Sequence, residues 1–157
     1  MRIILVFLMV FFLNFNSFAF EAGEKIDFSL AKIDGSRFVS SQEFEGLKTI
    51  IIFFDIDCLP CVKKINYINE NIDKFYNVNI VVINLIDEKV RKNQIINFEL
   101  NEKIVFLQAP KNPKIFLRKF GNNSGALPFL ALISNNGIFC MNKTEMFSDD
   151  DLKKCDR

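Results

Sequence analysis

The chain has 157 residues and a formal net charge of +1, and half of its residues are hydrophobic. This length and composition suit one ordinary domain with a core of its own. The near-neutral charge gives no indication of nucleic acid or of an acidic membrane surface as a partner. The chain contains no histidine, which excludes a Cys–His catalytic pair and a histidine-ligated metal site.

The first residues have the pattern of a secretory signal. Arg2 supplies a positive charge, the run from Ile3 to Leu13 is apolar, and Ser17-Phe18-Ala19 places small residues where signal peptidase cuts. An uncleaved membrane anchor is the alternative, but polar residues interrupt the run before it reaches the roughly 20 apolar residues of a span. We therefore expect a cleaved signal peptide at 1–19, one domain at 20–157, and export to the periplasm or beyond the cell.

Turn and capping residues predict a β-hairpin at the start of the domain. The strands Phe28–Lys32 and Arg37–Ser40 flank Asp34-Gly35, a pair of residues that suits a tight turn. Ser40 or Ser41 can then cap a short helical turn, because a hydroxyl oxygen accepts hydrogen bonds from the first free N–H groups.

Two cysteines follow the most apolar strand of the sequence. The run from Thr49 to Phe54 predicts a buried central strand, and Cys58-Leu59-Pro60-Cys61 then begins a helix predicted to run to about Phe75. Cysteines three residues apart on one helical turn can form and break a disulfide. The N-terminal end of a helix also stabilises the reactive thiolate. We interpret Cys58 and Cys61 as a redox pair, with a structural disulfide or half of a metal site as alternatives.

The rest of the chain alternates strands with helices. The predicted strands are Val78–Leu85, Ile104–Gln108, Phe129–Ser134 and Gly137–Met141. The predicted helices are one from Asp87 or Glu88 to about Leu100, Pro113–Phe120, and Asp149–Cys155, the last of them capped by Ser148. This alternation predicts an α/β fold with a central mixed sheet, helices on both faces and an N-terminal β-hairpin extension.

The motifs together resemble the thioredoxin-fold thiol–disulfide oxidoreductases, specifically the exported TlpA/ResA-like branch that includes cytochrome c maturation thioredoxins. The resemblance covers nearly all of the chain after the signal. It is carried by Gly23 to Leu30 with Asp34-Gly35-Ser36, by Cys58-Leu59-Pro60-Cys61 after the strand, and by Ala126-Leu127-Pro128-Phe129. It implies a thioredoxin-like fold that works through its cysteines, without a separate cofactor or a metal.

The resemblance also implies roles for individual residues. Cys58 would exchange with the substrate and Cys61 would resolve the mixed disulfide. The bond before Pro128 would be cis and lie against the cysteines, so that Leu127 and Pro128 bind an extended peptide. The implied partners are an exported thiol or disulfide protein, such as apocytochrome c, and a membrane electron donor of the thiol-reducing type. A dithiol oxidase of the same fold is the alternative.

The sequence departs from this family beside the first cysteine. Asp57 stands where the family usually has Trp, and Asp55 is close by. These carboxylates disfavour a thiolate at Cys58, whereas Lys63, Lys64 and the helix dipole favour one. The departure leaves open a binding module with a permanently oxidised pair. A thiol peroxidase ranks last, because Asp55 occupies the position where that family usually has Thr.

An acidic residue near the active site is a further family feature. Asp87 is the nearest match, with Glu88 next, and it follows the strand after the cysteine helix. A carboxylate there can accept and return the proton of Cys61. Asp87 is equally well placed to cap the following helix.

Cys140 and Cys155 are the remaining cysteines. In an oxidising compartment we expect a structural disulfide that ties the last helix to the sheet, closing a loop of roughly 15 residues that is worth roughly 3 kcal/mol. A second redox pair that relays electrons to Cys58 and Cys61 is the alternative. A zinc site with all four cysteines fits the spacing poorly.

Overall fold

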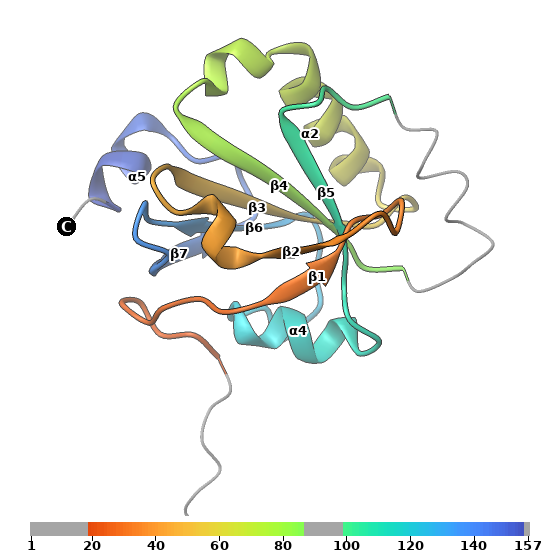
Figure 1. Cartoon of the computed structure of the whole chain (residues 1–157), viewed down its shortest axis with the longest axis horizontal. Helices are drawn as coiled ribbons and strands as arrows, with labels where there is room; N and C mark the ends of the chain where they lie inside the picture. Colours follow the sequence, from red (N-terminus) through yellow and green to blue (C-terminus); the bar gives the residue numbers. More distant parts are fainter. Residues whose placement is uncertain (1–18, 87–98, 156–157) are drawn as a thin grey trace, which may run out of the picture.

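A mixed five-stranded sheet forms the centre of the molecule (Figure 1). The computed structural model describes residues 19–86 and 99–155. The strand order is β5-β4-β3-β6-β7, with β3, β4 and β5 parallel and with β6 and β7 antiparallel to their neighbours. The strands are β3 (Lys48–Phe54), β4 (Val78–Asn84), β5 (Ile104–Gln108), β6 (Phe129–Ile133) and β7 (Phe139–Lys143).

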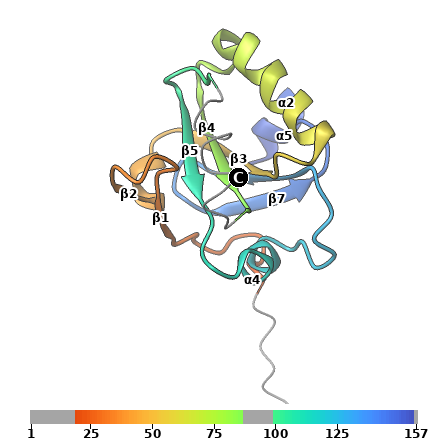
Figure 2. The ribbon, with the colours of Figure 1, turned by 90° about the vertical axis from the view of Figure 1, so that its right-hand side faces the viewer.

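Helices cover both faces of this sheet (Figure 2). The helices α2 (Leu59–Glu70) and α5 (Asp149–Lys154) lie on one face, and α4 (Pro113–Lys119) lies on the other. The predicted fold class is therefore confirmed. Within the described ranges, no helix combines the length and hydrophobicity needed to cross a membrane.

The central strand β3 explains why the sheet needs cover on both sides. Because successive side chains of a strand point to opposite faces, Ile50, Ile52 and Phe54 pack in the core layer with α2, whereas Ile51 and Phe53 pack in the layer with α4. All five are fully buried. A strand that is apolar on both faces lies in the middle of a sheet covered on both sides.

The N-terminal hairpin forms a separate two-stranded sheet, as predicted. Its strands are β1 (Ser29–Ala31) and β2 (Phe38–Ser40), and Gly35 adopts a φ of 75° in the turn between them. Ser40, rather than Ser41, caps the short 3-10 helix η1 (Ser41–Phe44) in a reciprocal capping box.

The helix predicted to run from Cys58 to Phe75 is shorter in the structure. It ends at Glu70, and the 3-10 helix η2 (Ile72–Phe75) follows. Asn71 interrupts it with φ −116° and ψ 26°, and its side-chain amide donates a hydrogen bond of 2.8 Å to the carbonyl oxygen of Tyr67. The asparagine side chain thus competes with the backbone for the helical carbonyl, which the apolar periodicity did not reveal.

Two predicted segments fall largely outside the described residues. These are the signal peptide at 1–19 and the helix that begins at Asp87. Both remain predictions.

Candidate active site

The two cysteines of the Cys58-Leu59-Pro60-Cys61 motif form a disulfide at the start of α2. Cys58 is the N-cap residue, and its sulfur accepts a hydrogen bond of 3.2 Å from the backbone N–H of Cys61. Cys61 is fully buried, whereas Cys58 is partly exposed. A thiolate that approaches from solvent can therefore reach the Cys58 sulfur and not the Cys61 sulfur.

Local hydrogen bonds hold the loop between β3 and α2. The Asp55 carboxylate accepts a 2.8 Å hydrogen bond from the backbone N–H of Asp57, and the Asp55 carbonyl accepts one of 3.0 Å from the N–H of Cys58. Pro60 lies in the first turn of α2, where no N–H donor is needed. Asp55 thus shapes the turn that presents Cys58, a role that its charge alone did not reveal.

The loop before β6 approaches the cysteines from the neighbouring strand. Phe129 at the start of β6 pairs with Phe53 near the end of β3, so the residues just before β6 lie beside the loop that leads to Cys58. The Leu127–Pro128 peptide bond is cis, as the resemblance implied. The side chains of Leu127 and Cys58 both pack against the core layer that contains α2.

Asn122 holds this loop, and sequence reasoning missed it. Its side chain is almost fully buried, donates a 2.9 Å hydrogen bond to the carbonyl of Ala126 and accepts one of 2.8 Å from the N–H of Gly125. It therefore braces the backbone directly before Leu127. The sequence showed only a polar loop of Gly, Asn and Ser, and no local pattern marks which asparagine of such a loop is buried.

The second cysteine pair lies elsewhere on the molecule. Cys140 in β7 and Cys155 at the end of α5 form a disulfide with Cα atoms 5.5 Å apart. A cavity of about 540 Å³ adjoins it, lined in part by Ala22, Asn136 and Lys154. The disulfide connects α5 to the edge of the sheet.

Charged side chains of α2, β7 and α5 influence one another's pKa values. Burial lowers the pKa of Lys64, one turn beyond Cys61, with Glu145 opposing this shift and Lys143 adding to it. The ammonium group of Lys143 contacts the Asp151 carboxylate, which also accepts a hydrogen bond from the backbone N–H of Ser148. These contacts hold the pKa of Asp151 well below its ordinary range.

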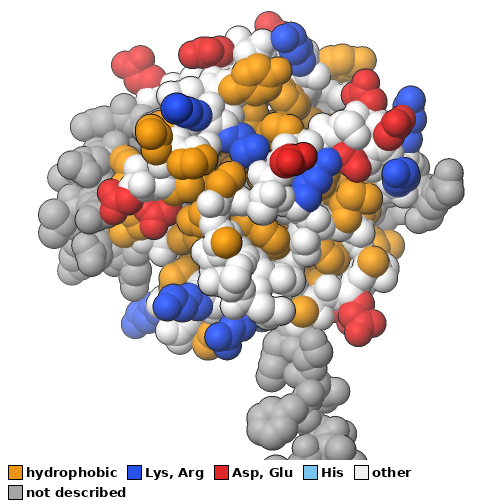
Figure 3. Space-filling view, turned by 180° about the vertical axis from the view of Figure 1, so that it is seen from behind, with side chains coloured by type: hydrophobic (Ala, Val, Ile, Leu, Met, Phe, Trp, Pro, Cys, Tyr) orange, Lys and Arg blue, Asp and Glu red, His pale blue; other side chains and the backbone are white. Residues whose placement is uncertain are grey.

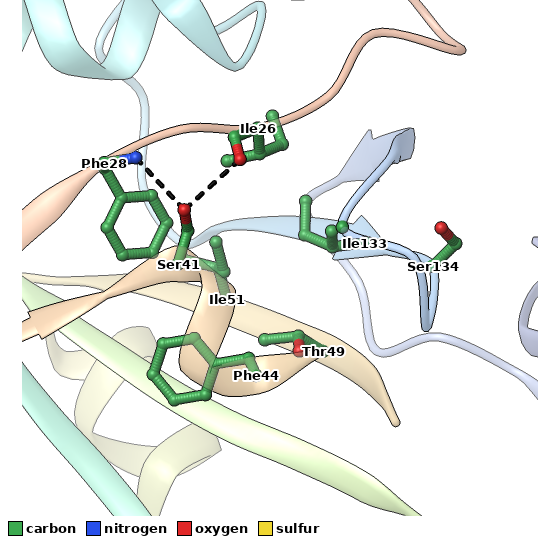
Figure 4. Close-up of a pocket in the computed structure, with 9 residues that line it drawn as sticks. Ile26, Phe28, Ser41, Phe44, Thr49, Ile51, Ile133 and Ser134 are labelled. Atoms are coloured by element: carbon green, nitrogen blue, oxygen red, sulfur yellow. Dashed lines mark hydrogen bonds between the residues drawn. The ribbon is translucent and has the colours of Figure 1, made fainter. Parts of the chain in front are cut away.

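A small cavity at the opposite end of β3 is too small for a ligand (Figure 4). The hydroxyl group of Ser41 donates to the carbonyl of Ile26 and accepts from the N–H of Phe28 at its wall, both at 3.2 Å. Its volume is about 10 Å³, which is at most the space of one water molecule.

Asp87, the predicted proton acceptor, lies outside the described residues, and its role stays a prediction. In the described part of the chain, no group of three or more His, Cys, Asp or Glu side chains is arranged to hold a metal ion.

Several solved protein structures share this fold. No family model and no curated protein matches the sequence. The structure is similar to the exposed lipoprotein thioredoxin of Streptococcus pneumoniae strain TIGR4, with TM-score 0.63 and 17% identity over 82% of this chain and 96% of that one. It is also similar to a putative thiol:disulfide interchange protein DsbE from Chlorobium tepidum, with TM-score 0.64 and 20% identity over 85% and 92%.

A third similar structure is copper-bound ScoI of Bradyrhizobium japonicum, with TM-score 0.59 and 15% identity over 87% of this chain and 98% of that one. At such identities the likeness establishes the fold alone. The chain has the fold of the thioredoxin-like thiol–disulfide oxidoreductases and carries a CxxC pair at Cys58 and Cys61.

Proposed function

We propose that this protein is an exported thiol–disulfide oxidoreductase of the TlpA/ResA-like type that reduces disulfides in exported proteins. The observation that carries the proposal is the asymmetry of the cysteine pair. Cys58 is partly exposed at the N-terminus of α2, whereas Cys61 is buried behind it. Exchange chemistry needs one accessible sulfur that reacts with the substrate and one protected sulfur that resolves the product.

The reaction begins from the reduced pair. The Cys58 thiolate attacks a substrate disulfide, whose S–S bond breaks to release one substrate thiolate and leave a mixed disulfide. Cys61, as a thiolate, then attacks the Cys58 sulfur and releases the second substrate thiolate. Two electrons have passed to the substrate, and Cys58 and Cys61 are again bonded. Asp87 is our candidate for the group that accepts the proton of Cys61.

Leu127 and Pro128 are the proposed peptide-binding residues. Within residues 19–86 and 99–155, no hydrogen bond involves the backbone N–H or C=O of Leu127. An extended substrate segment can use both groups by adding itself as a short strand. The Leu59 side chain, 62% exposed beside Cys58, offers an apolar contact to the same segment.

The predicted signal peptide supports export. Phe20 would be the first residue after cleavage, and its ring centroid lies 5.2 Å from that of Phe120 and 6.5 Å from that of Phe139. The first residue expected after cleavage therefore already packs against the core of the domain. Outside the cytoplasm a membrane donor of the thiol-reducing type would return the pair to the dithiol state, and a disulfide of an exported protein such as apocytochrome c would receive the electrons.

The reduction potential of the Cys58–Cys61 pair tests this proposal. The protein is equilibrated in glutathione or dithiothreitol buffers and its free thiols are counted by alkylation and mass shift, with Cys140→Ser/Cys155→Ser as the background. We expect a potential at or below about −230 mV, the range of reductants. A value near about −120 mV would identify a dithiol oxidase instead.

A binding module is the second candidate function. It is favoured by Asp57, which replaces the usual Trp, because a carboxylate near Cys58 disfavours its thiolate. A pair that exchanges with no dithiol at all would exclude the enzyme and leave this alternative as the remaining function.

A further inference from the structure

The segment around α4 carries only positive charges. Between Ile104 and Thr144 the sequence contains five Lys or Arg and no Asp or Glu. Four of the five lie in or beside α4: Lys111, Lys114, Arg118 and Lys119. In the described part of the chain, none of these four forms an ion pair. Figure 3 shows Lys and Arg side chains without Asp or Glu at the lower left, where α4 lies.

Two of these cations line a pocket together with the following loop. The basic pocket, as we name it, has a volume of about 150 Å³ and is lined by Lys114, Arg118 and the loop residues Asn122 to Gly125. Lys114 and Arg118 lie four residues apart in α4 and therefore project from one face. Their like charges repel each other, so an anion between them lowers the electrostatic energy.

The basic pocket adjoins the proposed peptide groove. Its loop leads directly into Leu127–Pro128, and the buried Asn122 side chain fixes the loop to the carbonyl of Ala126. Gly125 lies three residues before Pro128, so their Cα atoms are at most about 11 Å apart. The loop that lines the pocket therefore lies within a few residues' length of a peptide held at Leu127.

The other side of the groove is acidic. Asp55 and Asp57 lie in the loop immediately before Cys58. A peptide that crosses from this loop to the loop before Pro128 therefore meets carboxylates at one end and ammonium and guanidinium groups at the other. Such a groove discriminates between peptides by the order of their charges and not only by their net charge.

We propose that the basic pocket binds carboxylate side chains of the protein substrate, on one defined side of its reactive cysteine. This inference rests on the proposed exchange function and adds a substrate class: cysteine segments with acidic residues on the side that reaches Lys114 and Arg118. The loop that lines the pocket is uncharged and contributes only Asn, Ser and Gly residues, so the two cations supply the recognition of a carboxylate.

Two isomeric peptides test the inference on the purified protein. Each contains one cysteine in a mixed disulfide, with two Glu residues on its N-terminal side in one peptide and on its C-terminal side in the other, so composition and net charge are identical. The second-order rate constant of exchange with the reduced Cys58–Cys61 pair is measured at low and high salt. We expect one isomer to react about fivefold to tenfold faster, and salt to remove the difference.

The variant Lys114→Gln/Arg118→Gln should bring the ratio of the two rate constants close to one. Lys74→Gln/Lys103→Gln removes the same charge from exposed positions elsewhere and should retain the ratio. Equal rates for the two isomers with the unmodified protein would overturn the inference while the exchange itself confirms the enzyme. Absence of exchange with either peptide and with dithiothreitol would instead overturn the proposed function.

Anionic lipid headgroups are the alternative ligand for Lys114 and Arg118. Sedimentation with vesicles of phosphatidylcholine and phosphatidylglycerol distinguishes lipid binding from peptide binding. Binding that requires Lys114 and Arg118, together with equal rates for the two peptides, would overturn the assignment to a peptide and identify the pocket as a lipid headgroup site.

Discussion

The two disulfides have similar Cα–Cα distances, 5.2 Å for Cys58–Cys61 and 5.5 Å for Cys140–Cys155, but they lie at opposite ends of their helices. Cys58 caps the N-terminus of α2, where free N–H groups stabilise a thiolate. Cys155 lies at the C-terminus of α5, and its carbonyl oxygen is 3.7 Å from the Cys140 sulfur. The same covalent bond therefore has opposite electrostatic surroundings in the two places.

The position of a disulfide at one or the other end of a helix, rather than its presence, therefore separates a candidate reactive pair from a candidate structural one. The loop closed by each bond agrees with that division. The first pair is three residues apart and constrains little of the unfolded chain, whereas the second is 15 apart. Substitutions at the two pairs should therefore have different consequences.

The largest expected effect is on exchange activity. Cys58→Ser should reduce the rate of disulfide reduction to the uncatalysed background, because the only accessible sulfur of the pair is lost. Cys61→Ser should instead accumulate a mixed disulfide with the substrate, visible as a mass shift on a non-reducing gel. Full activity in Cys58→Ser would show that the reactive sulfur lies elsewhere.

Loss of the second disulfide should affect stability and not the potential of the first. We expect Cys140→Ser/Cys155→Ser to lower the free energy of unfolding by about 3 kcal/mol, because the unfolded chain gains loop entropy. Denaturant titration followed by circular dichroism measures the loss. An unchanged stability combined with a shifted Cys58–Cys61 potential would favour electron relay between the pairs.

The loop before Pro128 offers an intermediate effect. Asn122→Ala should cost about 0.5–1.5 kcal/mol of stability, since the backbone groups of Ala126 and Gly125 lose their hydrogen bonds to this buried side chain. It should slow exchange with a peptide more than exchange with dithiothreitol. Asn77→Ala, at an exposed position outside this loop, is the matched control and should change neither quantity. Equal slowing with both substrates would contradict a peptide-positioning role for the loop.

The smallest expected effect is the acid sensitivity of α5. The pKa of Asp151 lies below its ordinary value of 3.8 in the folded protein, so its contribution to stability is complete above that value and is lost as the pH falls through the lower folded value. Asp151→Asn should therefore flatten the pH dependence of unfolding below about pH 4. Asp150→Asn, at an exposed position on the same helix, should retain it.

Sequence reasoning succeeded where the signal is local. The double-sided apolar run of β3, the cysteine spacing at the start of α2 and the Ser148 cap of α5 each depend on residues within a few positions of one another. Hydrophobic periodicity and helix capping depend on neighbouring residues, so their contribution is largely independent of where the segment lies in the fold. They predicted the fold class and the candidate redox pair.

Only the tertiary structure decided what depends on distant residues. The pairing of β3 with β6 brings the Leu127–Pro128 loop beside Cys58, across some 70 positions of sequence, and it leaves Asn122 buried beneath that loop. The basic pocket joins α4 to the loop directly after it, but only the folded position of that loop, held by Asn122, brings these residues together. The physical reason is that local propensities are summed along the chain, whereas burial and charge proximity are set by which elements pack together.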